Sequence, residues 1–224
     1  MIVGKTNDSP RFRRNRWLLT VVCALYFVYT FIPIWYVITA STKTNPDLFT
    51  TFGLWFSSDF QLWQNLVDLF ARDRGIFGTW LWNTFYYATL SAIGATLVCT
   101  MAGYAFAKYD FFGKKFLFAL VLGAVMIPQT ALVIPLFLMF SSIKILDTPW
   151  AVILPALVFP QGVFLMRAYI DEAVSNEIID AGRVDGAGEF YIFSALAFRL
   201  LAPAATTIFV LSFVASWNNY FLPL

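Results

Sequence analysis

Residues 75–107 read GIFGTWLWNTFYYATLSAIGATLVCTMAGYAFA and contain no Asp, Glu, Lys or Arg. A hydrocarbon core about 30 Å thick is crossed by roughly 20 residues of α-helix. Because an unpaired backbone amide is costly in lipid, a segment of this kind is expected to be helical rather than an open strand. The stretch therefore predicts one membrane-spanning helix.

Four further charge-free windows, at residues 17–42, 116–143, 148–166 and 200–224, are each long enough for one more span. The alternation of apolar and polar residues that a membrane β-barrel needs is not visible in them. The expected fold class is all-α, a polytopic bundle of transmembrane helices. The five predicted spans are residues 17–38, 85–107, 116–141, 151–167 and 200–223.

The composition supports this class, because 60% of the 224 residues are hydrophobic and only 12% are charged. An average soluble domain has about 25% charged residues. The net charge of +2 gives no basic patch for nucleic acid, so we expect no nucleic-acid partner. The chain has no histidine, and its two cysteines both lie in apolar runs. We therefore expect no catalytic residues, no metal site and no bound cofactor.

The distribution of Lys and Arg predicts the orientation of the spans. Eleven of them lie in residues 1–16, 108–115 and 167–199, against four in the other connecting segments. The side with eleven is expected to be cytoplasmic, so residues 1–16 form a basic cytoplasmic N-terminus. Five spans then leave Leu224 outside, directly after apolar residues, which suggests that a sixth helix is missing from a truncated chain.

The segment at residues 43–82 is the largest one expected outside. Ser58 and Gln61 have the spacing of a capping box, which predicts the start of a helix. The apolar stripe that follows indicates a short amphipathic helix. We expect it to lie on the bilayer interface, with docking of an external partner as the alternative. The stripe consists of Trp63, Leu66, Val67 and Phe70.

The second predicted span carries small residues spaced three or four apart along one side. Such a ridge lets another helix approach closely, which drives helix association in lipid. We favour packing within the chain's own bundle over contact with a partner subunit. The ridge consists of Ala88, Ala92, Ala95, Cys99 and Gly103.

The third predicted span contains Pro128, Gln129, Thr130 and Pro135. Each proline frees the carbonyl four residues before it, and the two prolines are seven residues apart, on nearly the same helix face. These residues are candidates for a wall of the translocation pathway, with a purely structural kink as the alternative. Apart from Arg167 at the end of the fourth span, no charged residue falls inside the predicted spans, which argues against ion-coupled transport.

The cytoplasmic segment at residues 167–199 contains a predicted short helix near residues 177–188. Ser175 or Asn176 is expected to cap it, and Glu177 lies in its first turn, where the helix dipole favours an acid. An Asp180–Arg183 pair and a terminating Gly186 complete the pattern. Ala181 and Gly182 are small, and so we expect another protein's backbone to approach there.

This segment resembles the cytoplasmic coupling motif of the permeases of binding-protein-dependent ABC importers, in which Glu-Ala-Ala is followed by glycine after three residues. Asp180-Ala181-Gly182 and Gly186 match that pattern. Met126-Ile127-Pro128 and the stretch 102–108 are similar to segments of the sugar-importing, MalG-like branch. The chain departs from the motif at three positions, with Asp180 for Glu, Gly182 for Ala and Arg199 for Pro.

The resemblance implies that residues 17–224 form the transmembrane permease domain of an ATP-driven carbohydrate importer in the bacterial cytoplasmic membrane, normally a six-helix bundle. It implies three kinds of partner: a second permease subunit, two ATP-binding cassette subunits and an extracytoplasmic solute-binding protein. The resemblance places the ATPase contact at Glu177, Asp180, Ala181, Gly182, Asp185 and Gly186.

The chain contains no GxxxxGK[ST] loop, so it is not expected to be an enzyme, and ATP hydrolysis would fall to the partners. The alternative functions are a permease for an amino acid, peptide or phosphate, and an ion-coupled secondary transporter. An intramembrane enzyme or scaffold is a further alternative.

Overall fold

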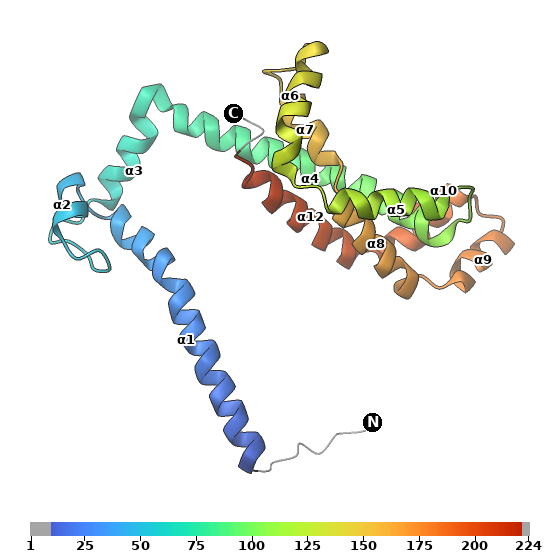
Figure 1. Cartoon of the computed structure of the whole chain (residues 1–224), viewed down its shortest axis with the longest axis horizontal. Helices are drawn as coiled ribbons and strands as arrows, with labels where there is room; N and C mark the ends of the chain where they lie inside the picture. Colours follow the sequence, from blue (N-terminus) through green and yellow to red (C-terminus); the bar gives the residue numbers. More distant parts are fainter. Residues whose placement is uncertain (1–9, 221–224) are drawn as a thin grey trace. The chain divides into compact units, whose positions relative to one another are not determined.

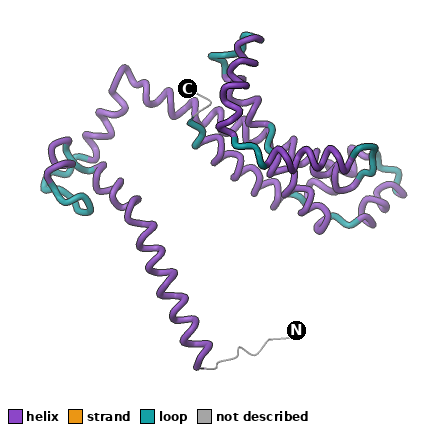
Figure 2. Tube along the Cα trace, viewed as in Figure 1, coloured by secondary structure: helices purple, strands orange, loops and turns teal. Residues whose placement is uncertain are grey.

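The computed structural model describes residues 10–220, with side chains from residue 16 onward, and these residues form helices joined by turns (Figure 1). None of the described residues lies in a strand (Figure 2). The chain divides into two compact units, Met1–Thr79 and Trp80–Leu224. The predicted all-α fold class is confirmed.

The first unit begins with α1 (Pro10–Ser41), and its segment Arg16–Ser41 is long and apolar enough to span a membrane. The predicted span at residues 17–38 lies inside it. Residues 1–9 lie outside the described residues, and with them most of the predicted basic N-terminus, residues 1–16.

After α1 the chain folds back on the end of that helix. The short helix α2 (Asn45–Thr50) is capped by Thr44, whose hydroxyl accepts from the backbone N–H of Asp47 at 3.3 Å. The ammonium group of Lys43 donates to Thr51 Oγ1 and to the Phe52 carbonyl, both at 2.8 Å. Asn65 donates to the carbonyl of Lys43 at 2.9 Å. These bonds join the end of α1, the loop after α2 and the next helix.

That next helix is α3 (Leu62–Ala71), which confirms the predicted short amphipathic helix. The predicted capping box is wrong, because the N-cap residue is Gln61 and its side chain donates to the Asp59 carboxylate at 2.7 Å instead of serving the helix. The turn η1 (Arg72–Gly75) follows α3.

The second unit holds most of α4 (Ile76–Lys108), which contains the predicted span 85–107. The predicted third span, residues 116–141, is not one helix. It consists of α5 (Lys114–Val125), the turn η2 (Gln129–Leu132) and α6 (Val133–Ser142), and the two helical parts are bent by 99°.

Pro128 explains the break. It has no N–H to continue the helix, and the residue before a proline is disfavoured in the α region. The carbonyl of Ala124, expected to be left free, accepts the N–H of Ile127 at 3.2 Å. The break also means that Pro128 and Pro135 do not share a face of one helix, contrary to the prediction.

The fourth predicted span, residues 151–167, lies in α7 (Pro149–Leu157) and α8 (Pro160–Ala173). Proline at the first position of each helix suits a residue without an N–H. The two helices together, Pro149–Ala173, form one candidate span.

The C-terminal part holds the short helix α9 (Asn176–Val184), a helical run Glu189–Leu200 and α12 (Ala202–Trp217). The run comprises α10 (Glu189–Tyr191), the π-helical η3 (Ile192–Ala197) and α11 (Phe198–Leu200). The fifth predicted span, residues 200–223, is therefore shorter, because a 78° bend precedes Ala202 and the helix ends at Trp217. Residues 221–223 of that prediction lie outside the described residues.

By length and composition, the described residues contain three candidate spans, or up to five if each bent pair counts as one. The five spans and the cytoplasmic N-terminus stay predictions. The second unit has a continuous apolar core in which α8 lies centrally, contacting α5 and α12. The core comprises Cys99, Tyr104, Val163, Met166, Ile170, Val174, Ile179, Ile192, Ala197, Leu201 and Ile208.

Candidate functional site

The short helix α9 begins where the sequence predicts. Ser175 is its N-cap residue, with extended backbone angles of φ −71° and ψ 150°. Its hydroxyl makes no bond to the helix backbone and instead donates to the carboxylate of Glu177, which lowers the pKa of that carboxyl. Glu177 lies in the first turn, as predicted, where its negative charge also suits the helix dipole.

The end of α9 is closed by Gly186, in the left-handed conformation with φ +77°. The Gly186 N–H donates to the Arg183 carbonyl at 3.0 Å, and the Ala187 N–H donates to the Gly182 carbonyl at 2.9 Å. This pair of bonds is a Schellman motif, which favours glycine at the left-handed position. The predicted stop at Gly186 is confirmed.

One face of α9 belongs to the core of the second unit. Ile179 is 4% exposed and Gly182 is buried. A Cβ atom at Gly182 would lie 3.1 Å from Ile192 Cγ1 and 3.2 Å from Leu196 Cδ1. The expectation that Gly182 offers a bare outer surface is wrong, since its small size serves packing against η3.

The opposite face of α9 is exposed. Figure 1 shows α9 beside the end of α8. Ile178, Ala181 and Val184 are spaced three apart, and Val184 is 87% exposed. Glu177 and Asp185 flank them and are also exposed. We call these five residues the outer face of α9. The sequence interpretation missed Ile178 and Val184, which the helical spacing from Ala181 would have found.

A polar network holds α9 to neighbouring elements. Arg183 Nε donates to Glu189 Oε1 at 2.7 Å, and Arg183 Nη1 donates to Asp180 Oδ1 at 3.2 Å, which confirms the predicted Asp180–Arg183 pair. The hydroxyl of Tyr109, the residue after α4, donates to Glu189 Oε2 at 2.8 Å. Tyr109 and Glu189 are further residues that the sequence interpretation missed, because their pairing joins positions 80 residues apart.

The hydrogen bonds change the acidity of the groups in this network. The Arg183 guanidinium, and after it the Tyr109 hydroxyl, lower the pKa of the Glu189 carboxyl. Burial, together with the negative Glu189, raises the pKa of Tyr109 to about 12. Glu189 is therefore ionised and Tyr109 remains a hydrogen-bond donor at neutral pH.

A second polar contact lies at the start of α9, where Lys108 Nζ donates to Asn176 Oδ1 at 3.2 Å. A small polar hollow of about 140 Å³ lies between this contact and the Arg183 network. It is lined by Lys108, Asn176, Ile179, Asp180 and Arg183.

The predicted small-residue ridge lies inside the chain's own bundle. Ala88, Ala92, Ala95 and Cys99 are at most 1% exposed, and Gly103 is buried. Cys99 Sγ lies 3.3 Å from the carbonyl oxygen of Phe159, at the start of α8. The structure thus agrees with packing within the bundle, the interpretation that the sequence favoured.

The residues predicted to line the translocation pathway are exposed, unlike the buried small-residue ridge. Pro128, Gln129, Thr130 and Pro135 are all exposed in this single chain. The first three lie at the break between α5 and α6, and Pro135 lies in the first turn of α6. The break lies inside the segment 116–141 that the sequence predicts as a span, and exposed polar side chains such as Gln129 and Thr130 are tolerated in a span only where protein or water covers them.

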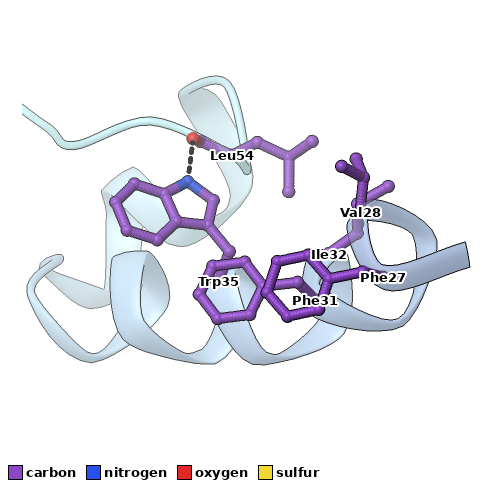
Figure 3. A pocket seen from close by; sticks show the side chains of 6 residues that line it. All are labelled: Phe27, Val28, Phe31, Ile32, Trp35 and Leu54. Atoms are coloured by element: carbon purple, nitrogen blue, oxygen red, sulfur yellow. Dashed lines mark hydrogen bonds between the residues drawn. The ribbon is translucent and has the colours of Figure 1, made fainter. Parts of the chain in front are cut away.

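The first unit has an apolar groove of about 220 Å³ (Figure 3). Its only side-chain N–H, Trp35 Nε1, already donates to the Leu54 carbonyl at 3.0 Å. A polar solute needs several converging polar groups, so this groove does not suit one. The groove is lined by Phe27, Val28, Phe31, Ile32, Trp35 and Leu54.

The model of the family described as "Binding-protein-dependent transport system inner membrane component" matches residues 99–224. This range includes α9 and its outer face, the Tyr109–Glu189 contact and the break at Pro128.

Two relatives are permease proteins by name. The arabinooligosaccharides transport system permease protein AraQ of Halalkalibacterium halodurans is 34% identical over 209 residues, covering 93% of this chain and 74% of the relative. The melibiose/raffinose/stachyose import permease protein MelC of Bacillus subtilis is 29% identical over 205 residues, covering 91% and 72%.

A solved structure, titled as a bacterial ABC transporter involved in the import of the acidic polysaccharide alginate, contains a chain of similar fold. The TM-score is 0.79, with 21% identity over 97% of this chain and 75% of that chain. At this identity the likeness concerns the fold alone.

Proposed function

Because this chain belongs to the family of binding-protein-dependent transport system inner membrane components, we propose that it is the permease subunit of an ATP-driven carbohydrate importer. The chain is a multi-pass membrane protein. Carbohydrate as the solute class is supported by the names of its relatives, which concern arabinooligosaccharides and the melibiose, raffinose and stachyose group.

The proposed assembly contains a second permease subunit, two ATP-binding cassette subunits and an external solute-binding protein. In the proposed orientation the N-terminus, the stretch 108–115 and α9 face the cytoplasm, following the excess of Lys and Arg there. ATP hydrolysis belongs to the partners, and this chain supplies the membrane pathway.

The observation that carries the mechanism is the two-sided packing of α9. Its inner face is fixed to the core by Ile179 and Gly182, whereas Val184 on its outer face is 87% exposed. Ile178, Ala181 and Val184 together form an exposed apolar strip along this acidic helix, and such a strip suits a pocket on a partner. We assign the outer face of α9 to the contact with one ATP-binding cassette subunit.

In this mechanism the predicted coupling residues divide into two roles. Glu177, Ala181 and Asp185 lie on the outer face and contact the ATPase subunit, and Asp180, which is exposed beside that face and pairs with Arg183, contributes to the same contact. Gly182 and Gly186 shape α9, the first by close packing on η3 and the second by ending the helix. Movement of α9 passes through η3 to α12 and through the shared core to α8, so nucleotide state and helix arrangement are coupled.

We assign the break at Pro128 to the wall of the translocation pathway. The exposed Gln129 and Thr130 supply hydrogen-bond donors and acceptors there, and the hydroxyl groups of a sugar require such groups. Because this wall carries no ionisable side chain, ATP rather than an ion gradient supplies the energy.

The test is uptake by the complex purified from its host through a tag on this chain. Proteoliposomes with ATP in the lumen and the binding protein outside are expected to accumulate labelled arabino-oligosaccharide, and omission of ATP is expected to abolish accumulation. Uptake driven by a Na⁺ or H⁺ gradient without ATP would instead identify a secondary transporter. ATP-dependent uptake restricted to amino acids, peptides or phosphate would refute the carbohydrate assignment.

The contact assigned to α9 is tested separately with Val184→Glu, which places a charge at the centre of the proposed interface. Because Val184 is exposed, folding is expected to be unchanged, while recovery of the ATPase subunit falls. Phe112→Ser is the matched control, since Phe112 is fully exposed on a different cytoplasmic segment. Equal ATPase recovery in the two variants would contradict this interface.

A further inference from the structure

Glu189 is shared between two elements that are remote in the sequence. One carboxylate oxygen accepts from Arg183 on α9 at 2.7 Å, and the other accepts from the Tyr109 hydroxyl, directly after α4, at 2.8 Å. The carboxylate therefore links the end of α4 to the last turn of α9 through the first residue of α10.

The other end of α9 has its own link to the end of α4. Lys108 Nζ donates to Asn176 Oδ1 at 3.2 Å, and Asn176 is the first residue of α9. Two consecutive residues at the end of α4 thus hold both ends of a nine-residue helix. The apolar contacts of Ile179 and Gly182 alone hold one face only, and such contacts are non-directional.

We infer that Tyr109 and Glu189 are positioning residues that fix the orientation of α9 relative to α4, so that movement imposed on α9 reaches α4 as well as α8 and α12. This inference rests on the proposed function and adds to it a specific mechanical link. Neither residue lies on the outer face of α9, so neither is expected to contact the ATPase subunit.

The contact of Glu189 with Arg183 and Tyr109 is partly exposed, so its role is measured by transport coupling and not by overall stability. The side chains of Arg183 and Glu189 are 44% and 48% exposed, and ion pairs of this kind contribute little to overall stability. Loss of the link is therefore expected to change the orientation of α9 while the bundle remains folded. The quantity to measure is the number of solute molecules transported per ATP hydrolysed, which we call the coupling ratio.

The experiment compares Tyr109→Phe with the wild type in the purified, reconstituted complex. This substitution removes one hydroxyl group and keeps the aromatic ring that packs against Tyr104 at 5.7 Å between centroids. We expect the ATPase subunit to remain bound and the coupling ratio to fall about fivefold, the effect of one net hydrogen bond on a two-state equilibrium. Amide hydrogen exchange is expected to rise in residues 176–189 and to stay unchanged in α12.

Asp110→Asn is the matched control. Asp110 is the next residue, and it pairs with Lys114 at 3.1 Å. Its loss is expected to leave the coupling ratio unchanged. Glu189→Gln is the second variant, and combining it with Tyr109→Phe is expected to add nothing further, because both substitutions break the same link.

The outcomes separate this inference from the proposed function. A wild-type complex that neither binds an ATPase subunit nor transports with ATP would refute the proposed function itself. A wild-type complex that transports, together with a Tyr109→Phe complex whose coupling ratio and α9 exchange match those of Asp110→Asn, would overturn only the positioning role. Fully additive effects of Tyr109→Phe and Glu189→Gln would also overturn it.

Discussion

Gly103 of α4 lies directly against Met166 of α8, so that a Cβ atom added at Gly103 would be 2.8 Å from the Met166 Cβ. The same atom would lie 3.0 Å from the backbone nitrogen of Arg167, which cannot swing away as a side chain end does. Without a strong hydrophobic drive in lipid, helices associate through such close contacts. This contact therefore fixes the distance between α4 and α8.

Replacing Gly103 by alanine is expected to force α4 and α8 apart and to destabilise the fold by about 1–3 kcal/mol, the usual cost of overpacking. Thermal unfolding in detergent, followed by circular dichroism, measures the change. Gly123→Ala in α5 is the matched control, because nothing lies within 4 Å of a Cβ there. The control is expected to be neutral or slightly stabilising, and equal destabilisation by both variants would contradict the proposed contact.

Substitutions at Gly182 are expected to have graded effects. An alanine Cβ at Gly182 would lie 3.1 Å from Ile192 Cγ1 and 3.2 Å from Leu196 Cδ1, so these side chains must shift by a few tenths of an ångström. Alanine also gains about 1 kcal/mol of helix propensity, which offsets that shift, and Gly182→Ala is expected to retain the ATPase subunit. Gly182→Trp has no room against η3 and is expected to displace α9, abolishing ATPase recovery without preventing membrane insertion. Co-purification from membranes measures recovery, and a Gly182→Trp variant with wild-type stoichiometry would count against the coupling role of α9.

The two prolines of the α5–α6 segment are expected to differ in importance. Pro128 stops α5, whereas Pro135 lies in the first turn of α6, where its missing N–H has no helical partner to lose. Pro128→Ala is expected to let the helix continue and to lower uptake roughly tenfold by removing the break. Pro135→Ala is expected to transport normally. Sugar uptake by proteoliposomes measures both effects. Equal loss of uptake in Pro128→Ala and Pro135→Ala would argue against the break at Pro128 as the critical feature.

The link through Glu189 is expected to weaken at acid pH. Hydrogen bonds from Arg183 and Tyr109 hold the pKa of Glu189 below its ordinary value of 4.5. A carboxyl with a lowered pKa stabilises the fold above its ordinary pKa, and this contribution is lost as the pH falls through the lowered value. We therefore expect α9 to become more mobile below about pH 4.5.

Fluorescence anisotropy of a label at Ala181→Cys, in a Cys23→Ser background, measures this mobility between pH 3 and 7. Asp180 and Glu177 are two further carboxylates on α9, so Glu189→Gln in the same background isolates the contribution of Glu189. The Gln variant is expected to have low anisotropy throughout, with a smaller pH dependence. The same pH profile with and without Glu189 would exclude it as the titrating group.

α9 shows which structural features can be predicted from residues that are close in the sequence and which cannot. Glu177 in the first turn, the Asp180–Arg183 pair and the stop at Gly186 follow from the sequence, because each depends on residues at most a few positions apart. Which face of α9 is buried does not follow, because this depends on Ile192 and Leu196, which approach only after the chain turns back at Gly186.

Charge-free segments long enough to cross a membrane determine from the sequence that the protein is all-α and membrane-spanning, because lipid leaves the backbone few alternatives to a helix. Only the tertiary structure decided that the kink expected at Pro128 is a 99° break, that Gly182 faces inward, and that Tyr109 reaches Glu189. Hydrophobicity is a property of each residue, whereas these three features depend on contacts between distant parts of the chain or on how a helix ends.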